Sequence, residues 1–367
     1  MPLSPLFRTI GYEALPGWDD DHLAPAFAAF RLCALKTPDH RYKTGALGVD
    51  AASFELAFAD ARSKPMLDDR SARAFFERHF LPCRIEPEGA SCGFVTGFYE
   101  PEVAASPCRT GEFSVPLLGI PDDLIKIDDS KRPFGLDPYL AFGRQTPTGL
   151  VEYHDRAAIE NGAIKDRAEP VAWLADRVDA FFIHVQGAAR LAMPDGTWHR
   201  VTYAAKSGQR FTGPGRVLAQ LGEIPASEVT MQSIRAWFRA NPHRIDEILQ
   251  QNRSYIFFRE APVDHPTLGP VAAAKVPLTA GRSVAVDRLL HTFGTPIFVD
   301  APTLDAFGEA GFRRLMIAQD TGSAIVGPAR GDLFAGSGDA AGEIAGVVRH
   351  EADMIALLPR ALVEERG

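Results

Sequence analysis

The chain has 367 residues, of which 46% are hydrophobic and 23% charged, a composition typical of a globular rather than a disordered protein. Lys and Arg number 39 against 47 Asp and Glu, and this net charge of −8, without a basic run, argues against a nucleic-acid-binding protein. No stretch reaches the roughly 18 consecutive apolar residues of a membrane-spanning helix. The N-terminus shows no secretory signal. We therefore expect a soluble chain, either cytoplasmic or exported with a signal that these residues do not include.

The first 90 residues are predicted to be mainly helical. Asp68 and Asp69 precede apolar residues at helical spacing, and residues 51–62 show a similar pattern. The character changes at residues 94–99, a run of β-branched and aromatic residues. Gly and Pro are frequent from there to about residue 149, which is typical of short strands and loops.

The middle of the chain is predicted to contain strands followed by helices. The apolar run 180–186 predicts a strand, and residues 190–193 and 198–203 flank a Pro-Asp-Gly turn, which predicts a hairpin. A helix is expected over 231–240. A second helix is expected after it, with Asn241 as its cap and Pro at its first position.

Strands dominate the last part of the chain in this prediction. A strand over 255–258 is followed, from residue 276 onward, by short apolar runs that alternate with Gly and Pro. These runs cover residues 297–299, 315–318, 323–326 and 355–358. Such spacing favours a small closed barrel over a βαβ sheet. The predicted fold class is therefore α+β, with a β-barrel in the C-terminal third.

Few residues have the spacing of a metal or nucleotide site. The four cysteines (Cys33, Cys83, Cys92 and Cys108) form no Cys-x-x-Cys pair, and no His-x-x-x-His pair occurs, so we expect no metal. The cysteines are either buried thiols or include one disulfide, from Cys83 or Cys92 to Cys108. The absence of a phosphate loop and of Gly-x-Ser-x-Gly weakens nucleotide-binding and serine-hydrolase interpretations.

Two aspartates carry the most informative pattern. Asp320 ends an apolar strand, and Asp332 lies twelve residues later, after an expected intervening strand and a Gly-Pro turn. A strand out and a bend back would bring both carboxylates to one end of a barrel. Alternatively, both are turn residues that accept bonds from nearby backbone N–H groups. Asp320 begins Asp-Thr-Gly, as in aspartic proteases, but that chemistry needs a second such motif, which the chain lacks.

Other residues indicate a carbohydrate ligand. Arg282, Asp287 and Arg288 form a charged stretch that either orients a substrate or makes a structural ion pair at a barrel rim. Aromatic residues that could stack on sugar rings are Phe98, Tyr99 and Trp198. Amide residues that could bond to hydroxyl or acetamido groups are Gln186, Gln232 and Asn252. Together with two carboxylates, these residues favour a glycan.

Six segments resemble the membrane-bound lytic murein transglycosylase A family, over roughly residues 97–359. They are Gly97-Phe98-Tyr99-Glu100-Pro101 and the stretches 179–187, 231–237, 252–258, 276–287 and 320–338. The resemblance implies a mainly β fold with helices, in which a second β-rich domain is inserted into a double-psi β-barrel domain and a glycan groove runs between them. The implied parts are residues 1–103 (helices and first barrel strands), 104–240 (the glycan-binding insert) and 241–367 (the rest of the barrel domain).

The resemblance also implies an activity. It is that of a peptidoglycan lytic exotransglycosylase without cofactor or metal, which cleaves the β-1,4 bond between N-acetylmuramic acid and N-acetylglucosamine and leaves a 1,6-anhydromuramoyl end. The catalytic aspartate of the family falls on Asp332 and its supporting aspartate on Asp320. The implied partner is a peptidoglycan strand. The implied state is a periplasmic monomer, with outer-membrane association through a lipid anchor outside these residues left open, and the residues themselves do not distinguish endo from exo action.

One carboxyl group can suffice for this reaction. The C6 hydroxyl of muramic acid attacks C1 of its own sugar, so no water needs activation. The same carboxyl can protonate the leaving oxygen and then accept the hydroxyl proton. To begin as an acid near neutral pH, Asp332 needs a pKa about two to three units above its ordinary value of about 3.9, which burial and a second carboxylate can supply.

We expect eight residues to contact the glycan, with Arg282 or Lys206 engaging substrate carboxylates. They are Tyr99, Glu100, Gln186, Gly187, Lys206, Thr279, Arg282 and Asp339. Two alternative functions remain open. One is a non-catalytic peptidoglycan-binding protein, and the other is an ordinary glycoside hydrolase, which would need a further carboxylate such as Glu100 or Asp339.

Overall fold

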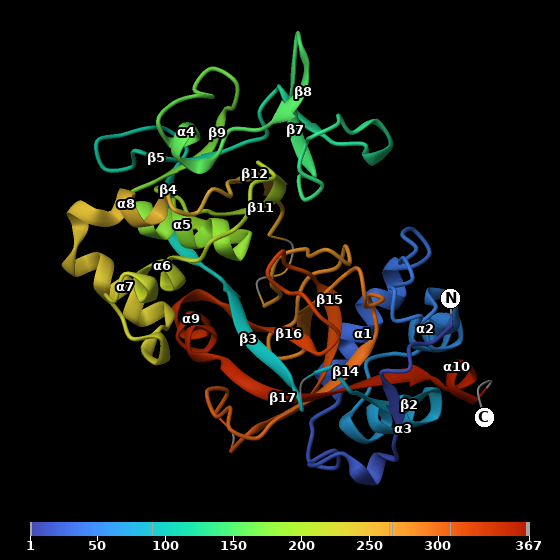
Figure 1. Cartoon of the computed structure of the whole chain (residues 1–367). Helices are drawn as coiled ribbons and strands as arrows, with labels where there is room; N and C mark the ends of the chain where they lie inside the picture. The colour runs from blue at the N-terminus through green and yellow to red at the C-terminus, as the bar shows by residue number, and fades with distance from the viewer. Residues whose placement is uncertain (1, 90, 264, 266, 309, 365–367) are drawn as a thin grey trace. The chain divides into compact units, whose positions relative to one another are not determined.

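The computed structural model describes residues 2–89, 91–263, 265, 267–308 and 310–364. The chain forms two compact units (Figure 1). The first combines Met1–Tyr99 with His265–Gly367, and the second consists of Glu100–Asp264. The second unit is therefore an insertion into the first, as the family resemblance implies.

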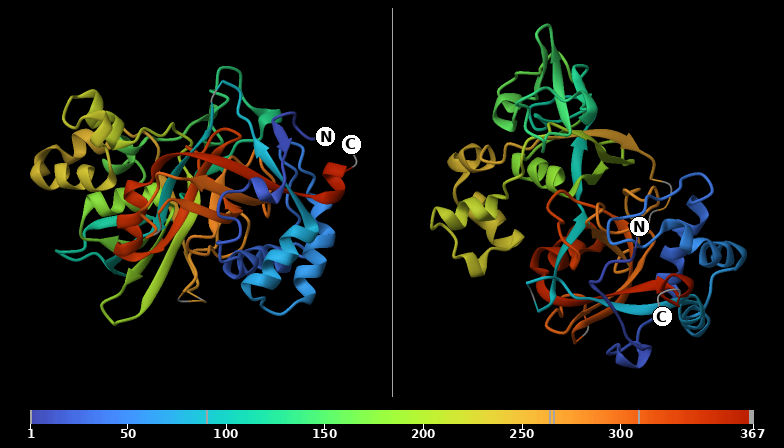
Figure 2. Two further views of the ribbon diagram at one scale, coloured as in Figure 1. Left: turned by 90° about the horizontal axis from the view of Figure 1, so that it is seen from below. Right: turned by 45° about the vertical axis from the view of Figure 1, so that its right-hand side comes forward.

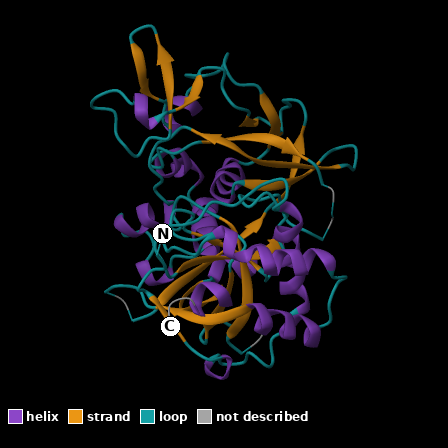
Figure 3. Ribbon diagram, turned by 90° about the vertical axis from the view of Figure 1, so that its right-hand side faces the viewer, coloured by secondary structure: helices purple, strands orange, loops and turns teal. Residues whose placement is uncertain are grey.

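One sheet organises the first unit. Its strands are β1 (Phe7–Thr9), β2 (Phe80–Ile85), β3 (Gly93–Glu100), β13 (Ser283–Val286), β14 (Pro296–Ala301), β15 (Phe312–Asp320), β16 (Arg330–Ser337) and β17 (Arg349–Pro359). Their order is β1-β2-β17-β14-β15-β13-β16-β3, and a further pairing of β17 with β3 closes six of them into a ring. Strands β13 and β15 pair in parallel. Figure 3 shows strands of this unit as curved rather than flat ribbons.

Helices cover part of this sheet. They are α1 (Ala24–Lys36), α2 (Glu55–Ser63), α3 (Asp69–His79), α9 (Gly338–Val347) and α10 (Arg360–Glu364), with 3-10 turns η1 (Tyr12–Ala14) and η2 (Ala51–Phe54). Helices α1 to α3 lie together (Figure 2), and α1 contacts β15. Asp68 caps α3 by accepting the Ser71 N–H, so the helices predicted at 51–62 and after Asp68 are confirmed.

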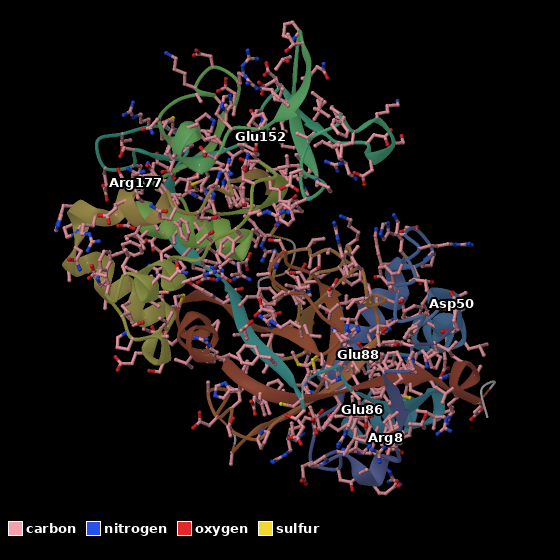
Figure 4. The ribbon with its side chains drawn as sticks, in the orientation of Figure 1. Arg8, Asp50, Glu86, Glu88, Glu152 and Arg177 are labelled. Carbon is pink, nitrogen blue, oxygen red and sulfur yellow. The ribbon has the colours of Figure 1, made fainter. Side chains whose placement is uncertain are left out.

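Short strands join the N-terminal helices to the sheet. Strand β1 pairs with β2, and the Arg8 guanidinium lies 3.3 Å from the Glu86 carboxylate just beyond that pairing (Figure 4). The first 90 residues are thus less purely helical than predicted. Both strands are short, so they show little of the alternation that identifies a strand in a sequence.

Helix α9 packs closely on β3 through two glycines. A Cβ on Gly342 would lie 2.9 Å from the Tyr99 ring, and one on Gly97 would lie 2.8 Å from Ala345 Cα. A larger residue at either position would separate the helix from the strand. This contact matters for the site because β3 also carries Thr96.

The second unit has two sheets. The larger has the order β12-β11-β10-β4-β9-β5, and the smaller β6-β7-β8. Their bounds are β4 (Glu102–Ser106), β5 (Val115–Leu118), β6 (Leu124–Lys126), β7 (Phe142–Thr146), β8 (Gly149–Glu152), β9 (Pro170–Leu174), β10 (Ala188–Ala192), β11 (Trp198–Lys206) and β12 (Ile256–Ala261). The predicted hairpin is confirmed, because β10 and β11 pair antiparallel across the Pro-Asp-Gly turn.

The helices of the second unit are α4 (Arg156–Glu160), α5 (Arg177–Gln186), α6 (Pro214–Gln220), α7 (Met231–Ala240) and α8 (Ile245–Leu249), with 3-10 turns η3 (Asp129–Lys131), η4 (Ala226–Glu228) and η5 (Pro242–Arg244). Helices α5 to α8 share one apolar cluster, whereas Ile159 of α4 packs in another with Tyr153 and Phe257.

The helix predicted over 231–240 is confirmed, and Thr230 with Ser233 forms a capping box at its start. Asn241 occupies the N-cap position of the next turn, η5, with Pro242 at its first position, as predicted. Its side chain makes no capping bond there and instead donates to Trp237 O at the end of α7.

The strand predicted over 180–186 is wrong, because this run lies in helix α5. The carboxylate of Asp176 accepts the N–H groups of Val178 and Asp179 and so begins the helix. The helix is apolar on two faces, since Ala180 packs into the sheet core and Phe181 into the helical cluster. A segment buried on two sides gives the same short apolar run as a buried strand.

The predicted domain boundary at residue 240 also needs correction, because the second unit extends to Asp264. Strand β12 pairs with β11, so the chain returns to the second sheet after α8. Arg177 (labelled in Figure 4) bonds Asp246 of α8 at 2.6 Å and Glu160 of α4 at 3.0 Å. These contacts hold residues 241–264 in the insert.

Two further predictions concern the cysteines and residues 323–326. All four cysteines are free, so of the two alternatives the disulfide is wrong.

Residues 323–326 form a turn rather than the predicted strand, and a single loop connects β15 to β16. Within the described part of the chain, the helices are too short or too polar to cross a membrane.

Candidate active site

Asp320 and Asp332 lie on two strands that flank β13. In the register of the sheet, Ala285 of β13 pairs with Asp320 of β15 on one side and with Asp332 of β16 on the other. Neighbouring strands are about 4.8 Å apart, so the two aspartate backbones are separated by about 10 Å. The sheet therefore brings the two predicted acids together, although no strand lies between them in the sequence.

The Asp332 carboxylate is held by a hydrogen bond from β3. The Thr96 hydroxyl donates to Asp332 Oδ1, and Arg330 Nη2 donates to Thr96 Oγ1 at 2.7 Å. Burial raises the pKa of Asp332, while the Thr96 bond and the positive charge of Arg330 oppose that rise. The net direction is upward, which favours a carboxyl group that retains its proton above the usual range.

Asp320 is held by backbone groups. Its Oδ1 accepts the Ala273 N–H at 3.2 Å. Burial raises the pKa of Asp320 from its ordinary value of 3.8 to about 6; the N–H groups of Thr321 and Ala273 oppose this rise, and the negative charge of Asp332 adds to it. Burial is therefore the main cause of the raised pKa of Asp320, and the charge of Asp332 is a smaller one.

The loop between the two acids is anchored by Asp287 and His291. Asp287 accepts the N–H groups of Gly327 and Leu289, each at 3.0 Å, and His291 Nε2 donates to Pro328 O at 2.8 Å. Burial lowers the pKa of His291, so the ring is neutral and carries its proton on Nε2. Asp287 therefore fixes the connection between the acids rather than facing a substrate.

The pH dependence of folding should report on Asp320. Because its pKa rises on folding, its contribution to stability is fully present below about pH 4 and is lost as the pH rises through about 6. Asp320→Asn keeps an acceptor oxygen and removes the charge. We expect it to raise the free energy of unfolding by about 1–3 kcal/mol at pH 8 and by much less at pH 4.

Urea unfolding at both pH values measures this effect. The matched control is Asp20→Asn, which changes an exposed aspartate in the same way. An equal gain for Asp320→Asn at both pH values would contradict a raised pKa at this position.

Comparison with known proteins identifies the family of the chain. The family model of the MltA specific insert domain matches residues 94–259, and that of the 3D domain matches residues 282–358. A crystal structure of a membrane-bound lytic murein transglycosylase from Agrobacterium tumefaciens is 46% identical, with a TM-score of 0.92, and the match covers 98% of this chain and 99% of that one. The chain belongs to the membrane-bound lytic murein transglycosylase A family.

Other members of the transglycosylase A family give weaker matches. MltA from Neisseria gonorrhoeae is 32% identical with a TM-score of 0.78, over 96% of this chain and 92% of that one. The membrane-bound lytic murein transglycosylase A of Escherichia coli K12 is 31% identical over 261 residues. That match covers 70% of this chain and 62% of the E. coli protein.

Arg282, which we expected to engage substrate carboxylates, has a structural role in this family member. Its guanidinium bonds both oxygens of Asp21, at 2.7 and 3.0 Å, and the carbonyls of His22 and Leu315. Arg282 and Asp21 are both buried. Arg282 therefore makes a structural ion pair and does not orient a substrate. It is no longer a substrate-binding candidate.

Tyr99 and Glu100 are also buried. Tyr99 packs on α9 at Gly342 and is 6% exposed. Both oxygens of Glu100 accept bonds from Arg200, at 2.6 and 3.1 Å, and Arg190 lies 3.1 Å away. Because Glu100 is 1% exposed, it is not available to a sugar or as the second carboxylate of a hydrolase.

Three predicted contacts lie in the insert domain of the transglycosylase A fold. Gln186 ends α5, and Gly187 follows it with φ of 79°, the left-handed conformation that favours glycine. Gly187 O accepts the Tyr203 N–H at 2.7 Å, which places this turn beside β11, the strand that ends at Lys206. Gln186 and Lys206 are both partly exposed, so they remain candidates.

Thr279 and Asp339 lie in the first unit. Thr279 Oγ1 is buried without a hydrogen-bond partner among the described residues. Asp339 is exposed in the first turn of α9. Of the predicted aromatic residues, Phe98 is buried against Phe334 at a ring distance of 5.2 Å, whereas Trp198 is 50% exposed. Phe98 is thus part of the core.

The sequence analysis missed Thr96 and Arg330. Arg330 and Asp332 are alternate residues of β16, and alternate residues of a strand share a face. Their spacing therefore indicated that Arg330 lies on the same face as Asp332. Thr96 is adjacent to the segment starting at Gly97 that resembles the family, but its contact with Asp332 depends on β3 lying beside β16. No local pattern identifies that pairing.

Proposed function

We propose that this chain is a lytic transglycosylase that cleaves the β-1,4 bond between N-acetylmuramic acid and N-acetylglucosamine in peptidoglycan. The observation that carries the proposal is the setting of Asp332. It is a partly buried carboxyl group with a raised pKa, beside a second carboxyl group across one strand. The names of the relatives support the substrate, since they describe lytic murein transglycosylases.

Asp332 acts twice in the proposed mechanism. As an acid, it gives its proton to the glycosidic oxygen while the bond from that oxygen to C1 of muramic acid breaks. The C6 hydroxyl of the same sugar then forms a bond to C1, and its proton passes to the Asp332 carboxylate. The carboxyl group is restored, and the product carries a 1,6-anhydro ring. The attack is intramolecular, so it benefits from a high effective concentration.

Asp320 acts on Asp332 through charge in this proposal. Two nearby carboxyl groups resist simultaneous ionisation, so the pair holds one proton to higher pH than an isolated aspartate does. We propose that this shared proton resides on Asp332 when the glycosidic oxygen is near it.

Finer parts of the proposal concern fold, location and binding. We propose that the six-strand ring is a double-psi β-barrel, which its closure and the parallel pair β13–β15 support. We propose a periplasmic location, because murein lies outside the cytoplasmic membrane. We also propose that the protein acts as a monomer. The proposed contacts to the glycan are Gln186, Gly187, Lys206, Thr279 and Asp339.

Digestion of purified murein tests the proposed function. The soluble products are analysed by mass spectrometry, in which a 1,6-anhydro end is one water lighter than a reducing end. We expect anhydro ends. Reducing ends would indicate an ordinary hydrolase, and binding to murein without any product would indicate a binding protein; either result would overturn the proposal.

A further inference from the structure

A chain of two hydrogen bonds joins Arg330 to Asp332 through Thr96. Arg330 Nη2 donates to Thr96 Oγ1, and the Thr96 hydroxyl donates to Asp332 Oδ1. A guanidinium can only donate, and a hydroxyl has one hydrogen. Because Arg330 occupies an acceptor position of Thr96 Oγ1, the single Thr96 hydrogen is left for Asp332.

The position of Arg330 is itself fixed. Its Nη1 donates to the Gly331 carbonyl and, at 3.5 Å, to the Phe94 carbonyl, and its Cζ lies 5.6 Å from the centre of the Phe94 ring. Among the described residues, Arg330 makes no direct ion pair with Asp332. Its charge therefore acts over a longer distance than in a salt bridge, which leaves the carboxyl group able to hold a proton.

We propose that Arg330 is a positioning residue for the reaction, which orients the Thr96 hydroxyl as a permanent donor to Asp332 and favours the carboxylate that receives the C6 proton. This proposal rests on the proposed function. A single carboxyl group that must first give and then accept a proton works best when neither form is strongly preferred. Burial favours the protonated form of Asp332, and Arg330 with Thr96 favours the ionised form.

Other charged groups lie on strands of the same sheet, on the loops beside them and on α9, which contacts β16. They are Asp320 on β15, Asp287 after β13, Lys275 in the loop before β13, Arg349 and Glu351 on β17, and Asp339 on α9. Arg349 pairs with Thr96 in the register of β17 and β3, and Glu351 pairs with Phe94. Both are exposed, so solvent and salt screen them more strongly than they screen Arg330.

Two substitutions test the proposal. Arg330→Gln removes the charge and keeps a donor for Thr96, and Thr96→Val removes the donor to Asp332 at nearly constant volume. In each variant we expect the alkaline limb of the kcat/KM profile to move up by about one pH unit, because the ionised carboxylate loses stabilisation. The midpoint of the Asp332 carboxyl titration, followed by ¹³C NMR, should move in the same direction.

Matched controls separate this effect from a structural one. Arg349→Gln makes the same change on β17, which pairs with β3, and should leave both the pH profile and the titration unchanged. Thr96→Ser restores the donor and should restore both. If Arg330→Gln does not fold, the comparison of Thr96→Val with Thr96→Ser still tests the donor.

The NMR titration distinguishes this proposal from the proposed function, because it needs no turnover. An unmoved Asp332 midpoint in folded Arg330→Gln, or an equal shift in Arg349→Gln, overturns the role of Arg330 even if the wild-type chain releases anhydro sugars. A shift confined to the Arg330 and Thr96→Val variants supports the role of Arg330 even if the chain releases none.

Discussion

Asp332→Asn should abolish the release of 1,6-anhydro sugars from murein, with a loss of about 10³-fold or more in turnover. The amide cannot protonate the glycosidic oxygen or accept the C6 proton, so both steps assigned to Asp332 fail together. The Thr96 hydroxyl can still donate to the amide oxygen, and the local fold should persist. Mass spectrometry of timed digests measures the loss.

Binding provides the control for this variant. Asp332→Asn should retain its affinity for insoluble murein in a sedimentation assay, because the other proposed contacts, such as Gln186 and Lys206, are unchanged. Asp20→Asn alters an exposed carboxylate outside the proposed site by the same chemical step and should retain the activity. Near-normal turnover of Asp332→Asn would refute the single-acid mechanism.

Glu100→Gln should destabilise the second unit by about 3–5 kcal/mol, the typical cost of breaking a buried ion pair from one side. Arg200 bonds both oxygens of Glu100 and also donates to Pro262 O at 3.4 Å, so it joins the two ends of the inserted segment. The amide would remove the buried negative charge that faces both Arg190 and Arg200.

Tryptophan fluorescence during urea unfolding measures this change, because Trp173, Trp198 and Trp237 all lie in the second unit. The matched control is Glu102→Gln, since Glu102 also pairs with Arg190 but its side chain is 32% exposed, and we expect a cost below about 1 kcal/mol. Equal costs for the two variants would show that burial of Glu100 is not the cause. Under conditions where Glu100→Gln is folded, its turnover should match wild type.

Local signals were sufficient for several elements. The carboxylate of Asp68 and the Thr230 capping box mark helix starts, and the Pro-Asp-Gly turn marks a hairpin, because each depends on residues within one turn of the chain. The same reasoning failed for residues 180–186. There the choice between helix and strand was made by burial against the sheet on one side and the helical cluster on the other.

Side-chain identity predicted the candidate acids but not their setting. Asp320 and Asp332 were identified from their chemistry and from the resemblance, whereas the strand between them, with Ala285 at its centre, comes from an earlier part of the chain. Arg282 and Glu100 are charged residues in family-like segments and were therefore assigned to substrate. Their partners, Asp21 and Arg200, could not be read from their neighbours in sequence.

The sequence by itself predicted the mixed α+β class of the fold from composition and short patterns, and its family-like motifs implied the insertion and pointed to the two acids. Tertiary structure alone decided which charged side chains are buried in ion pairs and which groups contact Asp332. Arg282 and Asp21 are separated by 261 residues, and Thr96 and Asp332 by 236. Because the environment of a carboxylate is set by what folding brings within a few ångströms of it, its pKa and its role follow from contacts that no local pattern encodes.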